Sequence, residues 1–133
     1  MQLKDVMQRK LESVAPNTPL REAAQKMNTL GVRMLPVCEG DKIIGTLTFR
    51  DLTMRATAQG RDPVASKVRE VMTREVVSCL ETQDARRAAG IMRRRRIGQM
   101  FVLDRKKHLT GVVSLEDLQR NRSRQSRQGA RRC

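Results

Sequence analysis

Apolar positions along the first half of the chain predict a strand, a helix, two more strands and a second helix. Leu20, Ala23, Met27 and Leu30 recur at the spacing of an amphipathic helix, which we expect over residues 19–30. Short apolar segments on either side of it, separated by turn residues, favour strands. The remaining elements are expected at Leu11–Ala15, Met34–Cys38, Lys42–Thr48 and Asp51–Gln59.

The second half of the chain repeats the first at an offset of 65 residues, which becomes 66 after His108. The aligned pairs are Val6-Met7 with Val71-Met72, Ala23-Ala24 with Ala88-Ala89, Gly45 with Gly111, and Asp51-Leu52 with Asp117-Leu118. The second set of elements is therefore expected at Val76–Leu80, Asp84–Arg95, Gln99–Leu103 and Leu109–Ser114, with a last helix from Asp117. A duplication of this length indicates two copies of one supersecondary unit.

This order of elements predicts a mixed α/β (α+β) fold made of two β-α-β-β-α repeats. A unit of about fifty residues with few large side chains is too small to bury an apolar sheet face alone, so we expect the copies to pack about a pseudo-twofold axis. The boundaries are expected at 1–60 for the first repeat, 61–67 for a linker, 68–120 for the second repeat and 121–133 for a basic, disordered tail.

The net charge narrows the class of partner. Twenty-eight Lys and Arg residues stand against fourteen Asp and Glu residues, giving a formal net charge of +14 over 133 residues. Phosphate-bearing partners are thereby favoured over cationic ones. The absence of Trp and Tyr argues against a base-stacking platform for single-stranded nucleic acid.

Other features exclude several functional classes. The chain shows neither a long apolar run nor an apolar leader, so we expect a cytoplasmic protein that does not enter a membrane. Its three cysteines (Cys38, Cys79 and Cys133) are far apart and His108 is its one histidine, so neither a disulfide framework nor a zinc site is expected. No nucleophile is placed beside a base, and we expect neither a catalytic site nor a cofactor.

The repeated pieces resemble the CBS domain family, the small modules named after cystathionine β-synthase. The resemblance covers nearly all of the chain except the basic tail. It is carried by Leu35-Pro36-Val37 and by a G-x-x-[ST]-x-x-D pattern, which occurs at Gly45–Asp51 and again at Gly111–Asp117. Each piece alone is common, but their order, duplicated at a fixed offset, is typical of a tandem CBS pair.

The resemblance implies two clefts between the copies that bind adenosine derivatives such as AMP, ADP, ATP or S-adenosylmethionine. It also implies a homodimer with a regulatory role and no chemistry of its own. In ligand-binding members the Asp of the pattern receives the ribose hydroxyls, the Ser or Thr faces phosphate, and the strand entry lines the base. The implied residues of cleft one are Asp51, Thr48, Arg50, Val32, Met34, Pro36 and Val37, and those of cleft two are Asp117, Ser114, Ile97, Gln99 and Phe101.

The second copy departs from the first at two places. Met100-Phe101-Val102 replaces Leu35-Pro36-Val37, and Arg96 replaces Gly31 at the expected end of the helix. Cleft two is therefore expected to be altered, blocked by Phe101 or specific for another ligand. Because Arg50 is matched by Glu116, cleft one is the better candidate for phosphate.

Simpler structural roles stay open for the same residues. Thr48 and Asp51 are residue types that cap helix N-termini, and Gly45 and Gly111 are small enough for close backbone approach. Arg50 is also the kind of side chain that is ordinarily solvated at a helix start. Arg93–Arg96 falls in the last turn of a helix, where cations complement the dipole, and can also contact phosphate.

Three functions remain consistent with the sequence. The favoured one is a module that senses an adenine nucleotide and signals to an unidentified partner protein in trans. The second is a basic interaction protein with empty clefts, which binds nucleic acid or an acidic partner through its Arg clusters, including weak binding through the Arg-rich tail. The third is a structural dimer that has lost its ligand sites.

Overall fold

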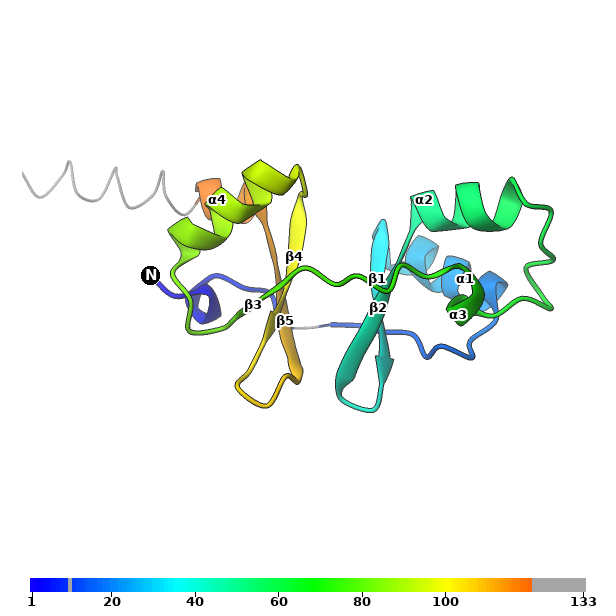
Figure 1. Ribbon diagram of the computed structural model, residues 1–133, viewed down its shortest axis with the longest axis horizontal. Helices are drawn as coiled ribbons and strands as arrows, with labels where there is room; N and C mark the ends of the chain where they lie inside the picture. The colour runs from blue at the N-terminus through cyan, green and yellow to red at the C-terminus, as the bar shows by residue number, and fades with distance from the viewer. Residues whose placement is uncertain (10, 121–133) are drawn as a thin grey trace, which may run out of the picture. The chain divides into compact units, whose positions relative to one another are not determined.

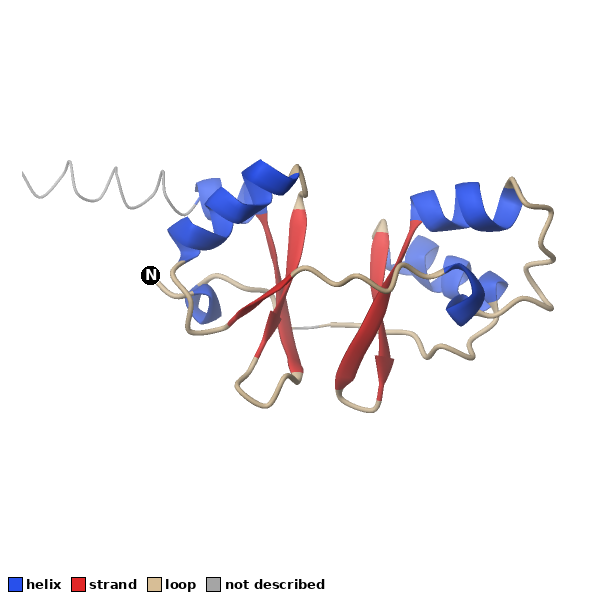
Figure 2. Cartoon of the chain, in the orientation of Figure 1, coloured by secondary structure: helices blue, strands red, loops and turns tan. Residues whose placement is uncertain are grey.

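The computed structural model describes residues 1–9 and 11–120, so the tail expected at 121–133 lies outside the described residues (Figure 1). Its elements in chain order are the 3-10 helix η1 (Leu3–Asp5), α1 (Leu20–Leu30), β1 (Met34–Glu39), β2 (Lys42–Thr48), α2 (Phe49–Asp51), the π-helix η2 (Leu52–Thr57), α3 (Val68–Val71), β3 (Ser78–Leu80), α4 (Ala85–Arg95), β4 (Gln99–Leu103) and β5 (Leu109–Ser114). Residues 115–120 are also helical. The mixture of helices and strands confirms the α/β class (Figure 2).

The chain forms two compact units whose boundaries differ from those of the sequence repeats. The first-repeat unit spans Glu12–Val76, and the second-repeat unit combines Met1–Leu11 with the chain from Val77 onward. The linker expected at 61–67 lies within the first-repeat unit, where the Leu20 N–H donates to the Ser66 carbonyl at 3.0 Å. These residues therefore lie against the start of α1.

In the first-repeat unit, α1 packs on an antiparallel pair of strands. Met34 lies opposite Thr48, and the register runs from there along β1 and β2. The helix ends at Gly31, which adopts φ +68°, a conformation that glycine reaches without strain. The buried core consists of Val14, Leu20, Ala23, Met27, Leu35, Val37, Leu47, Ala56, Val68, Val71 and Met72.

In the second-repeat unit, three strands form a sheet in the order β3-β4-β5. β3 runs parallel to β4, and β4 runs antiparallel to β5 with Gln99 opposite Ser114. Helix α4 begins after its N-cap, Asp84, whose Oδ1 accepts the Arg86 N–H at 2.9 Å. The core consists of Leu3, Met7, Cys79, Ala85, Ala88, Ala89, Met92, Met100, Val102, Val113 and Leu118.

Each unit is completed by the Val-Met segment that belongs, in sequence, to the other repeat. Thr73 pairs with Thr46 beside Gly45, and Gln8 pairs with Val112 beside Gly111. A Cβ on Gly45 would lie 2.8 Å from the Thr73 carbonyl oxygen, and one on Gly111 would lie 2.9 Å from that of Gln8. Both glycines therefore make room for a neighbouring backbone.

Two local expectations are wrong. Residues 11–15, all described, form no strand, because only Val14 bridges Val37. Asp51 does not start the second helix: Thr48 is its N-cap and Asp51 is its third residue. The pattern did not reveal these features because a single bridge needs no apolar alternation and because Thr and Asp are both common at helix starts.

Candidate functional site

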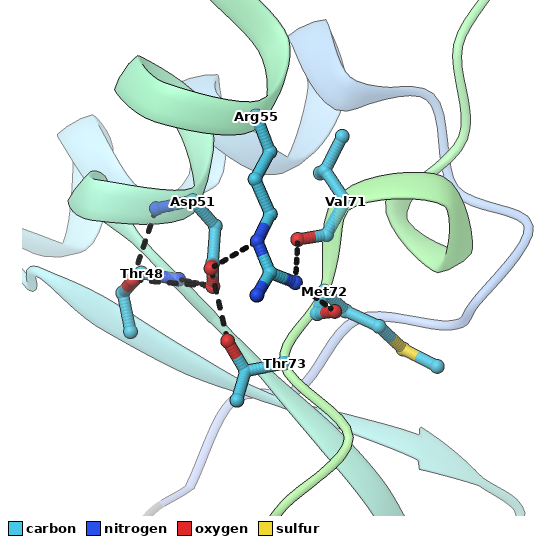
Figure 3. Close-up of polar contacts among 6 residues, drawn as sticks. All are labelled: Thr48, Asp51, Arg55, Val71, Met72 and Thr73. Carbon is cyan, nitrogen blue, oxygen red and sulfur yellow. Dashed lines mark hydrogen bonds and ion pairs between the residues drawn. The ribbon is translucent and has the colours of Figure 1, made fainter.

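The corner between β2 and α2 holds Thr48 and Asp51 in a reciprocal arrangement. The Asp51 N–H donates to Thr48 Oγ1 at 3.2 Å, and Asp51 Oδ2 accepts the Thr48 N–H at 3.0 Å and the Thr48 hydroxyl at 3.1 Å (Figure 3). This capping box satisfies backbone donors that the start of a helix leaves without partners. The capping interpretation of these two residues is therefore confirmed, and it does not conflict with a ligand role.

The second carboxylate oxygen of Asp51 is held by a different part of the chain. The Thr73 hydroxyl donates to Asp51 Oδ1 at 2.9 Å, and the guanidinium Nε of Arg55 lies 3.9 Å from the same oxygen (Figure 3). Asp51 is only 4% exposed. Hydroxyl donors on both oxygens thus replace the water that burial removes.

Arg55 connects this corner to the end of α3. Its Nη1 donates to the Met72 carbonyl at 3.1 Å and to the Val71 carbonyl at 3.5 Å (Figure 3). These oxygens lie at the C-terminal end of a helix, where a cation is favourable. Arg55 lies in the π-helix η2, four residues after Asp51. Its guanidinium therefore contacts both the Asp51 carboxylate and the carbonyls at the end of α3.

An open polar pocket of about 550 Å³ lies at the surface beside Arg55 in the same unit. It is lined by Arg55, Gln59, Arg61 and Glu70. Arg61 Nη1 lies 3.6 Å from a Glu70 carboxylate oxygen. Charges of both signs therefore face this pocket.

The structure brings several of the other cleft-one residues to the same corner. Met34 lies opposite Thr48, and the Phe49 N–H donates to the Arg33 carbonyl at 3.1 Å, which ties the entry of β1 to the start of α2. Val32 and Met34 are half-buried there, and Arg50 is exposed.

The two remaining cleft-one residues lie deeper. Pro36 is buried opposite Thr46. Val37 is fully buried and belongs to the hydrophobic core of its own unit. A ligand that remains at the strand entry would therefore meet Val32 and Met34 before either of these side chains.

The second-repeat unit has a matching corner between β5 and the helix of residues 115–120, which keeps the helix cap but has no threonine at the position of Thr73. Ser114 Oγ accepts the Asp117 N–H at 3.0 Å, so the capping half of the pattern is kept. The position of Thr73 is taken by Gln8. Among the expected lining residues, Gln99 is exposed, Ile97 is half-buried and Phe101 is only 4% exposed.

Sequence reasoning missed Thr73 and Arg55. Thr73 follows the repeated Val71-Met72 pair directly, and Arg55 stands four residues after Asp51, within reach on a helix. Both spacings can be read from the sequence. The sequence does not show that the segment Val71–Thr73 packs with the first repeat, which is what brings these residues together.

In residues 1–9 and 11–120, no group of three or more His, Cys, Asp and Glu side chains is placed to hold a metal ion. In that same part of the chain, none of the helices has the length and apolar character needed to cross a bilayer.

Comparisons with known proteins agree on one family. The model of the CBS domain matches residues 3–56 and 68–124. The CBS domain-containing protein YhcV of Bacillus subtilis is 37% identical over 116 residues, which are 87% of this chain and 81% of the relative.

Solved structures share the fold over most of the chain. A protein with CBS domains from Burkholderia ambifaria is 30% identical with a TM-score of 0.75, and the match covers 85% of this chain and 82% of that one. The CBS domain pair of protein MJ0100, in complex with 5′-methylthioadenosine and S-adenosyl-L-methionine, is 25% identical with a TM-score of 0.79, covering 94% and 98%.

Proposed function

Because the chain belongs to the CBS domain family, we propose that it is a regulatory module that binds an adenosyl ligand and signals to a partner protein in trans. The ligand is an adenine nucleotide or a related adenosyl compound. The similar domain pair of MJ0100 supports the ligand class, since it is in complex with two adenosyl compounds. The module carries no catalytic step of its own.

The observation that carries this proposal is the set of partners around Asp51. Its carboxylate accepts hydrogen bonds from the hydroxyls of Thr48 and Thr73 at 3.1 and 2.9 Å. A ribose offers two neighbouring hydroxyls, which can replace a protein hydroxyl at the same oxygen with little change in hydrogen-bond energy. Val32 and Met34 supply half-buried apolar surface near this corner.

Replacement of Thr73 gives the ligand a way to change the shape of the protein. Thr73 lies three residues before Val76, where the first-repeat unit ends. A ligand that takes Asp51 Oδ1 releases the hydroxyl of Thr73 and loosens this end of the unit. Such a ligand shifts the population of conformations only if it binds one of them better than another.

Thermal unfolding of the full chain tests the proposal. The ligands are AMP, ADP, ATP, S-adenosylmethionine and 5′-methylthioadenosine, and the matched probes are the 2′-deoxy forms of the nucleotides. A ligand at 100 times its Kd stabilises by about 2.7 kcal/mol, which raises the midpoint by several degrees. We expect at least one ribose compound to do so and its 2′-deoxy form to do so less. If none of the five raises the midpoint, the proposal is wrong.

The expected homodimer is a separate part of the proposal. Light scattering on the purified chain measures its mass directly. A mass of twice 15.2 kDa supports the dimer, and a mass of 15.2 kDa contradicts it.

A further inference from the structure

Helix α4 presents a face made of arginines. Its core side carries Ala85, Ala88, Ala89 and Met92, all buried. The exposed side carries Arg86 and Arg87 in the first turn and Arg93 and Arg94 in the last. We call these four residues the α4 arginine face. Figure 2 shows α4 beside the strands of its own unit.

Helix geometry gathers the four side chains into two pairs. Residues seven apart lie two turns apart on nearly the same side of an α-helix, so Arg86 stands in line with Arg93 and Arg87 with Arg94. The two members of each pair are separated by about 10.5 Å along the helix axis, at 1.5 Å per residue. The face thus presents positive charge along the whole helix.

The stability of the helix does not account for this arrangement. Cations in the last turn complement the helix dipole, but cations in the first turn oppose it. Helix α4 carries Arg86 and Arg87 there and no acidic residue, whereas the matching helix α1 has Glu22 in its first turn. The dipole of the helix therefore does not favour the two first-turn arginines, although the acidic N-cap Asp84 lies beside them.

Ion pairs within the described residues leave the face positive. Two ion pairs of the second-repeat unit join His108 with Asp104 and Arg120 with Glu116, and neither includes a residue of the face. The nearest acidic residue in sequence is Asp84, whose Oδ1 accepts the backbone N–H of Arg86. The four guanidinium groups are exposed to solvent and available to a partner.

The end of the helix adds a fifth cation at the expense of backbone strain. Arg96 adopts φ +56° in the left-handed region, where the first repeat has Gly31 at φ +68°. A side chain other than glycine is unfavourable there by roughly 1 kcal/mol. An exposed arginine thus stands at a position that glycine would fill without strain.

We propose that the α4 arginine face binds the phosphodiester backbone of a nucleic acid. Guanidinium groups match phosphate oxygens in a bidentate manner, and the α4 arginine face presents four of them along one exposed side of a helix, where a backbone of repeated phosphates can meet several at once. A membrane surface is disfavoured, because an interfacial helix must insert apolar side chains and those of α4 are buried in the core. This activity is independent of the ligand site at Asp51.

Fluorescence anisotropy tests the proposal with labelled 20-nucleotide probes of double-stranded DNA, single-stranded DNA and double-stranded RNA. The variant is the full chain with Arg86, Arg87, Arg93 and Arg94 changed to Gln. Its matched control has Arg21, Lys42, Arg69 and Arg74 changed to Gln, four exposed cations of the first-repeat unit. Both variants lose four charges and keep the five arginines of residues 121–133.

For the best-bound probe, we expect the α4 variant to lose at least tenfold in affinity and the control much less. Each lost phosphate contact on duplex DNA also lowers the slope of log K against log salt by about 0.9. Thermal unfolding midpoints close to that of the wild type would show that both variants fold. If the fourfold variant is partly destabilised, the double variant Arg86→Gln, Arg93→Gln replaces it. We expect the double variant also to bind the probe more weakly than the control does.

Three results would overturn the proposal. The first is a wild-type chain that binds none of the three probes. The second is an α4 variant that binds as well as the control. The third is an equal loss of affinity for poly-L-glutamate or for phosphatidylserine vesicles, which would indicate an acidic protein or a lipid surface as the partner.

Discussion

The hydroxyl of Thr73 and the carboxylate of Asp51, 22 residues apart in sequence, are joined by a 2.9 Å hydrogen bond inside the first-repeat unit. This contact ties the candidate ligand-binding carboxylate to the segment that leads out of the unit at Val76. We expect a change at Asp51 to alter the position of Thr73, three residues before the end of the unit.

Thr73→Val removes the hydroxyl but keeps the shape of the side chain. The buried Asp51 Oδ1 then lacks its shortest hydrogen bond, which we expect to cost about 1–3 kcal/mol of the free energy of unfolding. Thr29→Val, at an exposed position of α1, is the matched control and should leave the midpoint of unfolding nearly unchanged. Chemical denaturation of the three proteins measures the difference.

The same variant separates two roles of Thr73. If Thr73 competes with the ligand for Asp51, then Thr73→Val binds the ligand more tightly, by up to about tenfold for a hydrogen bond of about 1.5 kcal/mol. Calorimetric titration gives the dissociation constant. Weaker binding by the variant would instead mean that the hydroxyl contacts the ligand, and the competition would be excluded.

Glycine substitutions are expected to have opposite effects at different positions. At Gly111 a Cβ would lie 2.6 Å from Met7 Sδ, so Gly111→Ala should destabilise by roughly 1–3 kcal/mol. At Gly90, inside α4, nothing lies within 4 Å of the added Cβ, and Gly90→Ala should stabilise by about 0.5–1 kcal/mol. Thermal unfolding distinguishes the two signs, and a neutral Gly111→Ala would contradict the close approach of residues 7 and 8.

Most of the fold within each repeat was predictable because its signals are local. The spacing of Leu20, Ala23 and Met27 determines the buried face of α1, and β2 has the expected bounds, Lys42–Thr48. Gly31, the expected end of this helix, adopts the positive φ that glycine favours there. Each of these depends on residues that are neighbours in sequence.

The completion of each unit was not predictable from the same signals. Offset alignment placed Val71-Met72 at the start of the second repeat, yet α3 packs with the first-repeat unit. Nothing in the pattern of one repeat tells which sheet its leading segment joins. Thr73 and Arg55 were missed for this reason, since their contacts with Asp51 and the end of α3 depend on that pairing.

Burial raises the pKa of the thiols of Cys38 and Cys79 above that of a free cysteine. The reactive thiolate is therefore a smaller fraction of each at pH 8 than in an unfolded chain, and its fraction continues to rise at higher pH. We expect a disulfide reagent to modify Cys38 and Cys79 slowly in the folded chain. The rate of modification should still increase with pH above the pH at which the rate for a free cysteine has levelled off. The measurement uses Cys133→Ser to remove the third thiol, and rates equal to those of the unfolded chain would contradict it.

The most direct test of the account is calorimetric titration of the best-stabilising adenosyl ligand into the wild type, Asp51→Asn and Asp41→Asn. Asp41 is an exposed carboxylate in the turn between β1 and β2, and it controls for charge. The titrations are made where circular dichroism shows all three proteins folded. The account predicts that Asp51→Asn weakens binding at least tenfold while Asp41→Asn binds like the wild type. Wild-type affinity in folded Asp51→Asn would contradict the assignment of this carboxylate to the ligand.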